Sequence, residues 1–207
     1  MSLSTYIELK QEIIDWAHRG DIDLRVETFI KMAEQEMYAN PDEVLRIRGQ
    51  ETRSTATTDG KYLALPDDFQ SIRSLLITTS GGNVELLPKA PAQLVTEPTV
   101  GQPCFFAVTS QIEFDRIPDS NYGVIIQYYA VPAALSDTNA TNTILTNFPN
   151  IYLFGALSAA NTYANNNEEA AINYSSFIRS IKGANKKDKM GRYGPAPAIT
   201  LVGQGIA

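Results

Sequence analysis

Apolar residues recur at helical spacing through the first forty positions of the 207-residue chain. Side chains three and four positions apart share one face of a helix. The pattern therefore predicts two amphipathic helices that form an antiparallel hairpin and need a further surface to cover their apolar faces. The apolar positions are Tyr6, Leu9, Ile13, Trp16 and Ala17 in the first helix, and Val26, Phe29, Ile30, Ala33 and Met37 in the second.

Capping and breaking residues indicate where these helices begin and end. Thr5 and Glu8 have the spacing of a capping box, and Gly20 is expected to end the first helix. Asn40-Pro41 breaks the second helix, because proline lacks the backbone N–H that a helix interior uses. A short third helix is predicted across residues 44–47.

From Glu51 the apolar positions alternate with polar ones, which is the period of a half-buried strand. Segments 52–58 and 61–65 flank Asp59-Gly60, a dipeptide typical of a tight hairpin turn, and Gly81-Gly82 predicts a second hairpin. Short, closely spaced strands predict an antiparallel sheet or small sandwich. The further strands are expected at 72–78, 84–87, 105–109, 112–115 and 124–131.

Helical spacing returns after residue 138. Pro149 suits the first turn of a helix, and small residues such as Gly155 permit close contact with a neighbouring helix. Asn165-Asn166-Asn167 separates this helix from a last one, whose predicted apolar face is Ala171, Tyr174, Phe177, Ile178 and Ile181. The residues expected to carry helix packing are Trp16, Phe29, Tyr152, Leu157, Tyr174 and Ile178.

This order of elements predicts an α+β protein. The N- and C-terminal helices form an antiparallel helical bundle, into which an antiparallel β-sheet or sandwich region is inserted, and an extended C-terminal tail follows. The predicted parts are 1–50, N-terminal helices; 51–135, inserted β domain; 136–189, C-terminal helices; and 190–207, C-terminal arm.

The predicted arm carries no charged side chain after Arg192. Its two prolines favour extended backbone across Tyr193–Ala198, and Ile199–Val202 is a short strand-forming patch. An apolar segment of this kind needs a covering partner, unless it is merely a frayed terminus. We expect it to become ordered on a neighbouring subunit by strand addition or groove insertion, with Ile199, Leu201 and Val202 as anchors.

Charge is distributed unevenly along a chain whose net charge is −6. Residues 182–207 contain five basic residues and one acidic residue, whereas residues 1–181 contain 12 basic and 22 acidic residues. An acidic body argues against general binding of nucleic acid, because phosphate contacts need clustered lysine and arginine. The basic end is suited to an acidic partner, although lysines near a helix C-terminus also complement the helix dipole.

The sequence offers little that could support catalysis. It has no glycine-rich phosphate loop, no paired metal-ligand spacing and no nucleophile elbow, and its one cysteine, Cys104, is expected to be a buried thiol in a strand. No catalytic, metal-binding or cofactor-binding residue is predicted, and the chain is expected to be no enzyme. The weak candidates, each with a structural explanation, are His18, the pairs Asp67–Asp68 and Asp115–Asp119, the aromatic Tyr122, Tyr128 and Tyr129, and the basic Arg46, Arg48 and Arg53.

Five groups of residues recur in the same order in a known family of proteins. They are Ser4-Thr5-Tyr6 with Leu9, Trp16, Arg19 and Asp21; Phe29-Ile30 with Ala33-Glu34; Glu51-Thr52-Arg53 and Leu65-Pro66-Asp67-Asp68-Phe69; Tyr128-Tyr129-Ala130 with Pro132-Ala133 and Leu135-Ser136; and Asn147, Pro149 and Ile151 to Leu157. Through these residues nearly the whole chain resembles the head-to-tail adaptor proteins of tailed bacteriophages and prophages, in particular the tail tubular protein A-like group of short-tailed phages. Pro41-Asp42-Glu43 departs from the more continuous basic helix of those relatives.

The resemblance implies a structural virion protein in the phage neck, assembled in the host cytoplasm. It implies a ring, usually of twelve copies, that docks on the portal protein, connects the capsid to the tail and lines part of the DNA ejection channel. The implied partners are the portal and the tail nozzle, tail-tube or fibre proteins, while genomic DNA passes without specific binding. No membrane partner is expected.

The residues expected to contact the portal or a neighbouring copy are Lys186, Lys187, Lys189, Arg192, Tyr193, Ile199, Leu201 and Val202. The alternative is a monomeric glycan- or surface-binding β module of a phage tail, which would use exposed tyrosines instead. A hydrolase is a third hypothesis, resting only on Asp67 and Asp68.

Overall fold

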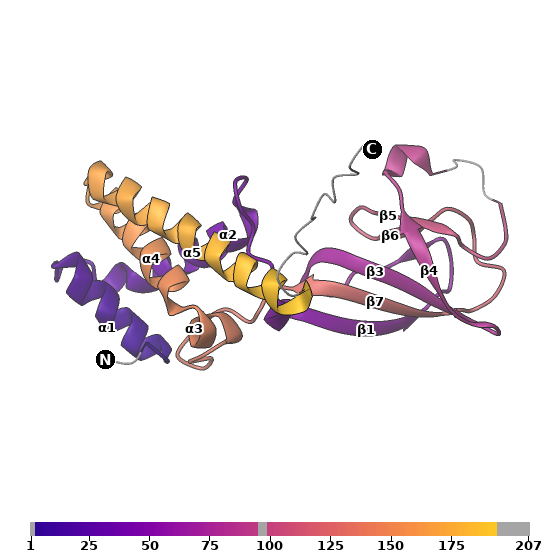
Figure 1. Cartoon of the computed structure of the whole chain (residues 1–207), viewed down its shortest axis with the longest axis horizontal. Coiled ribbons are helices and arrows are strands. Elements are labelled where there is room, and N and C mark those ends of the chain that lie inside the picture. The colour runs from indigo at the N-terminus through magenta and orange to yellow at the C-terminus, as the bar shows by residue number, and fades with distance from the viewer. Residues whose placement is uncertain (1–2, 95–98, 194–207) are drawn as a thin grey trace, which may run out of the picture. The chain divides into compact units, whose positions relative to one another are not determined.

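A computed structural model describes residues 3–94 and 99–193, with only the backbone of Tyr193 included. Across these residues the protein is α+β, with five α-helices and one curled seven-stranded sheet (Figure 1). Its internal contacts divide it into two units. The helical unit comprises the described residues up to Arg48 and from Leu135 onward, and the β unit comprises Gly49–Ala134.

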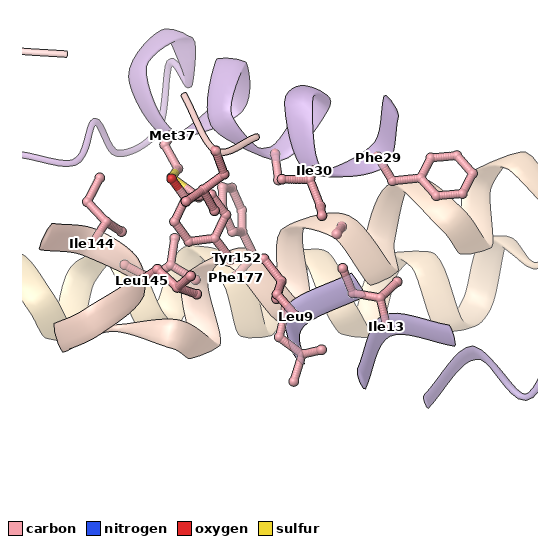
Figure 2. Packing of buried hydrophobic residues seen from close by; sticks show 14 of the residues in the cluster. Leu9, Ile13, Phe29, Ile30, Met37, Ile144, Leu145, Tyr152 and Phe177 are labelled. Atoms are coloured by element: carbon pink, nitrogen blue, oxygen red, sulfur yellow. The ribbon is translucent and has the colours of Figure 1, made fainter. Parts of the chain in front are cut away.

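Helix α4 is the centre of the helical unit, because α1, α2 and α5 all contact it. Contacts between α1 and α2 are few, so the predicted pairing of these two helices is less important than their shared packing on α4. Met37, Tyr152 and Phe177 converge in the core between α2, α4 and α5 (Figure 2). The helices are α1 Tyr6–Ala17, α2 Val26–Ala39, α3 Thr143–Asn147, α4 Pro149–Tyr163 and α5 Asn167–Tyr193.

The N-terminus of α1 is confirmed as a capping box. The Glu8 backbone N–H donates to Thr5 Oγ1 at 3.3 Å, and the Thr5 N–H donates to Glu8 Oε2 at 3.1 Å. The predicted stop at Gly20 is wrong, since α1 ends at Ala17 and His18 adopts a left-handed conformation with φ 50°. Histidine occupies the position that glycine usually takes at a helix C-terminus.

The predicted third helix across 44–47 is also wrong. Leu45 and Ile47 are buried while Arg46 between them is exposed, which is the alternation of an extended segment. A turn of 3-10 helix follows only at Arg48–Gln50. Asn40 starts the extended course, because its Oδ1 accepts the N–H groups of Asp42 and Glu43 and so satisfies them outside a helix.

Helix α5 differs from its prediction in which face is buried and where it ends. Ala170 is buried and Ala171 is exposed, so the apolar face is displaced by one residue at its start. Helix α5 also continues to Tyr193, and the four residues from Met190 are therefore helical although the prediction assigned them to the arm. The rest of the predicted arm, residues 194–207, lies outside the described residues.

The β unit contains a single sheet with strand order β1-β7-β3-β4-β5-β6-β2. Neighbouring strands are antiparallel except β4 and β5, which are parallel, so the expectation of a wholly antiparallel sheet is wrong at this pair. Leu75, Phe106 and Ile126 are among the buried residues of its separate core. The strands are β1 Glu51–Thr57, β2 Tyr62–Leu63, β3 Phe69–Thr79, β4 Gly82–Pro88, β5 Phe105–Val108, β6 Ile112–Phe114 and β7 Gly123–Ala130.

Strand pairing corrects the first predicted hairpin and confirms the second. β1 pairs with β7 along its whole length, and β2 pairs with β6, so Asp59-Gly60 does not join two paired strands. Buried Thr58 favours the distant partner, because its N–H donates to the Tyr122 carbonyl at 2.9 Å and its Oγ1 accepts the Tyr122 N–H at 2.9 Å. β3 and β4 form the expected hairpin, in which Thr79 pairs with Gly82 at φ 114°.

Candidate interaction surface

The C-terminal end of α5 presents an exposed group of lysines, Lys186, Lys187 and Lys189, here called the lysine cluster. The Nζ of Lys187 lies 5.4 Å from the ring centroid of Phe148, within range of a cation–π interaction. All three ammonium groups belong to residues open to water, where a negatively charged partner can reach them. The cluster is therefore a candidate docking site for an acidic surface.

Arg192 differs from the lysines because it forms an ion pair within the helix. Its side chain is 13% exposed, and its Nε donates to Asp188 Oδ2 at 2.6 Å. The other carboxylate oxygen of Asp188 accepts the Arg48 backbone N–H at 2.8 Å. This partly buried pair fixes the segment before the β unit to α5, so Arg192 stabilises the helix end that carries the lysine cluster.

A cavity of about 320 Å³ lies beside the lysine cluster, between α5 and the junction of α3 with α4. Phe148 and Ile151 supply apolar wall, Asn150 supplies an amide, and Lys187 supplies a positive charge. Gly183 leaves one wall open, because a Cβ at that position would meet nothing within 4 Å. This combination suits an apolar side chain with a nearby carboxylate.

Asn185 holds the extended segment 41–48 against α5. It lies one helical turn before Lys189, the last residue of the lysine cluster. Its Nδ2 donates to Glu43 Oε1 at 2.6 Å and to the Val44 carbonyl at 2.9 Å. Its Oδ1 accepts the Arg46 N–H at 2.9 Å. Among the described residues the extended segment has no neighbouring strand to pair with, so one amide side chain supplies hydrogen bonds to two of its backbone groups and to one carboxylate.

A buried carboxylate organises the centre of the helical unit. Glu34, 9% exposed, accepts the Leu135 N–H at 2.9 Å and the Tyr152 hydroxyl at 3.1 Å through Oε1. Asn142 Nδ2 donates to the same hydroxyl oxygen at 2.7 Å. Burial raises the pKa of Glu34 above its usual range, while the two hydrogen bonds oppose that shift.

The residues predicted to carry helix packing occupy different environments. Phe29, Tyr152 and Leu157 are buried, and Tyr174 and Ile178 are partly buried against the same core. Trp16 is 51% exposed, and its ring and that of Phe154 form an edge-to-face pair with centroids 6.1 Å apart. Trp16 therefore lies on the rim of the core, because Ala17 ends α1 just beyond it.

Four predicted arm contacts cannot be placed on this surface. Ile199, Leu201 and Val202 lie outside the described residues, as does the side chain of Tyr193. Their role remains a prediction from sequence. The lysine cluster is the part of the predicted contact set that the described residues bring together as exposed cations.

Structural partners hold three of the four carboxylates that the sequence offered as weak chemical candidates, while Asp67 is exposed in the turn before β3. Tyr128 donates its hydroxyl to Asp68 at 2.7 Å, and burial together with this bond raises the pKa of Tyr128 to about 12. Buried Asp115 accepts the N–H groups of Cys104 and Phe105. Asp119 accepts the Tyr122 hydroxyl at 2.6 Å. Through these hydrogen bonds, each of the three carboxylates stabilises a turn or the start of a strand.

The positions of the other weak candidates, His18, Cys104 and the tyrosines, do not match those expected for a catalytic or sugar-binding site. His18 lines an open cavity of about 480 Å³ with Glu12, Asp15 and Trp16 at the end of α1. Cys104 is exposed, which corrects the expectation of a buried thiol: it precedes β5 and lies outside that strand. Tyr128 is buried and stacks on Phe69, and its neighbour Tyr129 points to the opposite face of the strand, so the tyrosines form no shared platform there.

The arginine candidates fall in different parts of the protein. Arg46 and Arg48 are exposed in the helical unit, and Arg53 lies on β1 of the β unit. The residues that position the lysine cluster were not predicted from the sequence; they are Asn185, Asp188 and Phe148. The only sequence signal for Asp188 was its i, i+4 spacing to Arg192.

Among the described residues, no three or more histidines, cysteines, aspartates or glutamates gather where they could hold a metal ion. No helix in the same part of the chain has both the length and the apolar character needed to cross a membrane.

A family model described as SU10 adaptor protein matches residues 4–200, which is nearly the full length of the chain. No curated protein matches the sequence.

Proposed function

The chain belongs to the SU10 adaptor protein family, and from that premise we propose that it forms the adaptor ring between the head and tail of a phage. The ring has twelve copies, the number that the family resemblance implies. It docks on the portal protein, holds the tail nozzle, tail-tube or fibre proteins, and lines part of the DNA ejection channel. Its place is the virion neck, after assembly in the host cytoplasm.

The observation that carries the proposal is the family match across residues 4–200. It spans both units, so the proposal concerns the whole architecture and does not rest on a single module. Structural adaptors act by fitting between other proteins, and this role needs no catalytic residue. Enzymatic activity is no part of the proposed function.

The lysine cluster is the proposed contact with an acidic surface of the portal. Lys186, Lys187 and Lys189 are exposed at one end of α5, and the Asp188–Arg192 pair holds that helix end in place. Residues 194–207 follow directly and become ordered on assembly, using Ile199, Leu201 and Val202 as apolar anchors. Ordering such a segment costs about 2–5 kcal/mol of free energy, and the contacts formed on docking offset this cost.

The distribution of charge suits a channel that DNA traverses without adhering. Residues 1–181 hold 22 acidic and 12 basic residues. Like charges suppress contacts with phosphate, so DNA moves past an acidic wall without being held. Repetition of one contact by rotation closes a ring around such a channel.

The proposal is tested by mixing the purified protein with a portal protein and measuring mass by light scattering. A ring should form, and deletion of residues 194–207 should weaken portal binding while thermal unfolding of the helical unit stays unchanged. A protein that remains monomeric with and without portal would overturn the adaptor proposal. Tight binding to a glycan array by that monomer would favour the β-module alternative instead.

A further inference from the structure

Strand β1 forms one edge of the sheet in the β unit. It pairs with β7 on one side, and the strand order places no strand on its other side within the described residues (Figure 1). The opposite edge is β2, which has only two residues, whereas β1 has seven. A long edge without proline is a template for another strand unless the protein blocks it.

The pairing with β7 determines which backbone groups of β1 point outward. Thr58 and Tyr122 form a hydrogen-bonded pair, and the register runs from there without interruption along β1. Because hydrogen-bonded and non-hydrogen-bonded pairs alternate in an antiparallel ladder, Ser54 and Ala56 direct their N–H and C=O groups toward β7. Alternate residues direct theirs to the open edge.

Three successive outward residues of β1 are Arg53, Thr55 and Thr57. Across residues 3–94 and 99–193, none of these outward groups has a hydrogen-bond partner. The side chains of all three are exposed as well. An added strand would find three successive donor and acceptor positions, the pattern used in strand addition.

The core face of the sheet is incomplete at the same edge. Two rows of apolar side chains cross the sheet, and each row ends on β1 at a small residue. The rows are Leu75, Ile126 and Ser54, and Ile77, Val124 and Ala56. The inner members are buried, but Ser54 and Ala56 remain partly exposed. Two larger apolar side chains, spaced two residues apart on an adjacent strand, would extend both rows.

We propose that the open edge of β1 receives residues 199–202 of a second copy of this chain as an added strand. Ile199 and Leu201 have the required spacing and extend the two rows, while Thr200 lies opposite Thr55 on the solvent face. Thr200 is the middle residue of Ile199–Leu201, and Thr55 is the middle residue of Ser54–Ala56. The two threonines therefore lie opposite each other whether the added strand is parallel or antiparallel to β1. The inference rests on the proposed function, which supplies the neighbouring copy.

The length of the chain and the symmetry of a ring favour a second copy. The chain extends 14 residues beyond Tyr193, which can span up to about 45 Å when fully extended. The strand donor and the edge that accepts it are different surfaces, so the contact is heterologous and each copy can both give and receive. Such a contact links every member of a ring to the next.

Disulfide trapping tests the contact in the full-length protein. Cys104 is exposed and is first replaced by serine to remove the natural thiol. Thr55→Cys and Thr200→Cys are then combined in one chain, and assembly is carried out with portal protein under mild oxidation. Opposite residues in a hydrogen-bonded antiparallel pair have Cα atoms about 5.5 Å apart, within disulfide range. We expect covalent multimers on a non-reducing gel.

The matched control combines Thr200→Cys with Thr78→Cys, an exposed position on β3 that pairs with Asn83 of β4 on one side and with Gly123 of β7 on the other. It should give no multimers. Rings that assemble without a Thr55–Thr200 disulfide would overturn this inference and leave the adaptor proposal standing. An internal disulfide in single chains would also overturn it, since the strand would then come from the same copy. Failure of the unsubstituted protein to assemble would overturn both.

A proline pair provides a second test without cysteine. Thr55→Pro removes an outward N–H and is compatible with an edge strand, whereas Ala56→Pro removes a bond to β7. We expect Thr55→Pro to fold with unchanged thermal stability of the isolated protein and to raise the concentration needed for assembly by about tenfold or more. Assembly of Thr55→Pro at the unsubstituted concentration would contradict the proposal.

Discussion

Gly155 on α4 lies so close to Ala33 on α2 that a Cβ at Gly155 would be 2.8 Å from the Ala33 Cβ. On the side facing α5, the same Cβ would lie 3.0 Å from Cε2 of Phe177. The absent side chain at this position therefore allows α2, α4 and α5 to meet at one point. Phe177 is fully buried there, and α5 continues from it toward the lysine cluster.

Gly155→Ala should destabilise the helical unit by about 1–3 kcal/mol, the usual cost of overpacking a core. Ala33 cannot move aside without moving α2. The matched control is Gly183→Ala on α5, where a Cβ meets nothing within 4 Å. That control should stabilise by about 0.5–1 kcal/mol through helix propensity. Denaturant unfolding of both variants measures the difference, and equal effects would contradict this account.

Glu34→Gln should become more stable relative to the unsubstituted protein as pH rises. Burial raises the folded-state pKa of Glu34 above its ordinary value of 4.5. The contribution of this carboxyl is therefore fully present below the unfolded pKa and is lost as pH rises through the folded pKa. Glutamine keeps an oxygen to accept from Leu135 and Tyr152 but cannot ionise. Free energies of unfolding between about pH 4 and pH 7 measure the difference, which should increase.

A difference between these two proteins that fell with pH, or stayed constant, would show that Glu34 has no raised pKa. Glu34→Ala serves as the companion variant. It leaves the Leu135 N–H and the Tyr152 hydroxyl without their buried acceptor. Because neither alanine nor glutamine ionises, Glu34→Ala should be about 1–3 kcal/mol less stable than Glu34→Gln at every pH.

Asn185→Ala should release the extended segment 41–48 from α5. The substitution removes the donors to Glu43 and Val44 and the acceptor for Arg46. We expect a loss of about 1–3 kcal/mol and faster amide exchange at Arg46. Ser176→Ala on the same helix is a control of similar size, and it should change neither quantity. Unchanged exchange at Arg46 in Asn185→Ala would refute this anchoring role.

Neutralising the lysine cluster should weaken portal binding and reduce its dependence on salt. The triple variant of Lys186, Lys187 and Lys189 to glutamine should lose about tenfold in affinity at low salt, and less at high salt where screening is strong. The same charge change at exposed Lys31, Arg46 and Arg179 is the control. Titrations against portal at two salt concentrations compare them. Equal losses from both triples would indicate a general charge effect.

Backbone amides of β1 should exchange in alternation in the isolated protein. Ser54 and Ala56 direct their N–H groups to β7 and should be protected, whereas Arg53 and Thr55 direct theirs outward and should exchange rapidly. Hydrogen exchange followed by NMR resolves these residues. Uniform protection along β1 would contradict the register that the sheet displays.

Several elements could be predicted because their signals are local. The Thr5–Glu8 capping box, Pro149 at the start of α4 and the β3–β4 hairpin at Gly82 each depend on residues close together in sequence. Helical periodicity likewise identified the stripes that contain Phe29, Tyr152 and Phe177. The resemblance to phage adaptors agrees with the family match because it rests on the same linear order of residues.

The errors arose where a distant partner outweighed a local preference. Asp59-Gly60 is a strong hairpin signal, yet β1 gains a full ladder with β7, more than sixty residues away in the chain. The segment around Leu45 is extended because Asn185 satisfies its backbone, and nothing near Leu45 indicates this. Residues of the candidate surface such as Phe148 and Asp188 were missed for the same reason.

The sequence by itself determined the class of elements, their order, the uneven charge and the family. These follow from periodicity, capping and composition, which act over a few residues at a time. Only the tertiary structure decided which strand is an edge, which acid is buried beside Tyr152 and which cations remain exposed. Each of these depends on the free energy of pairing or burying groups that are far apart in the chain, and that energy exists only once the fold brings them together.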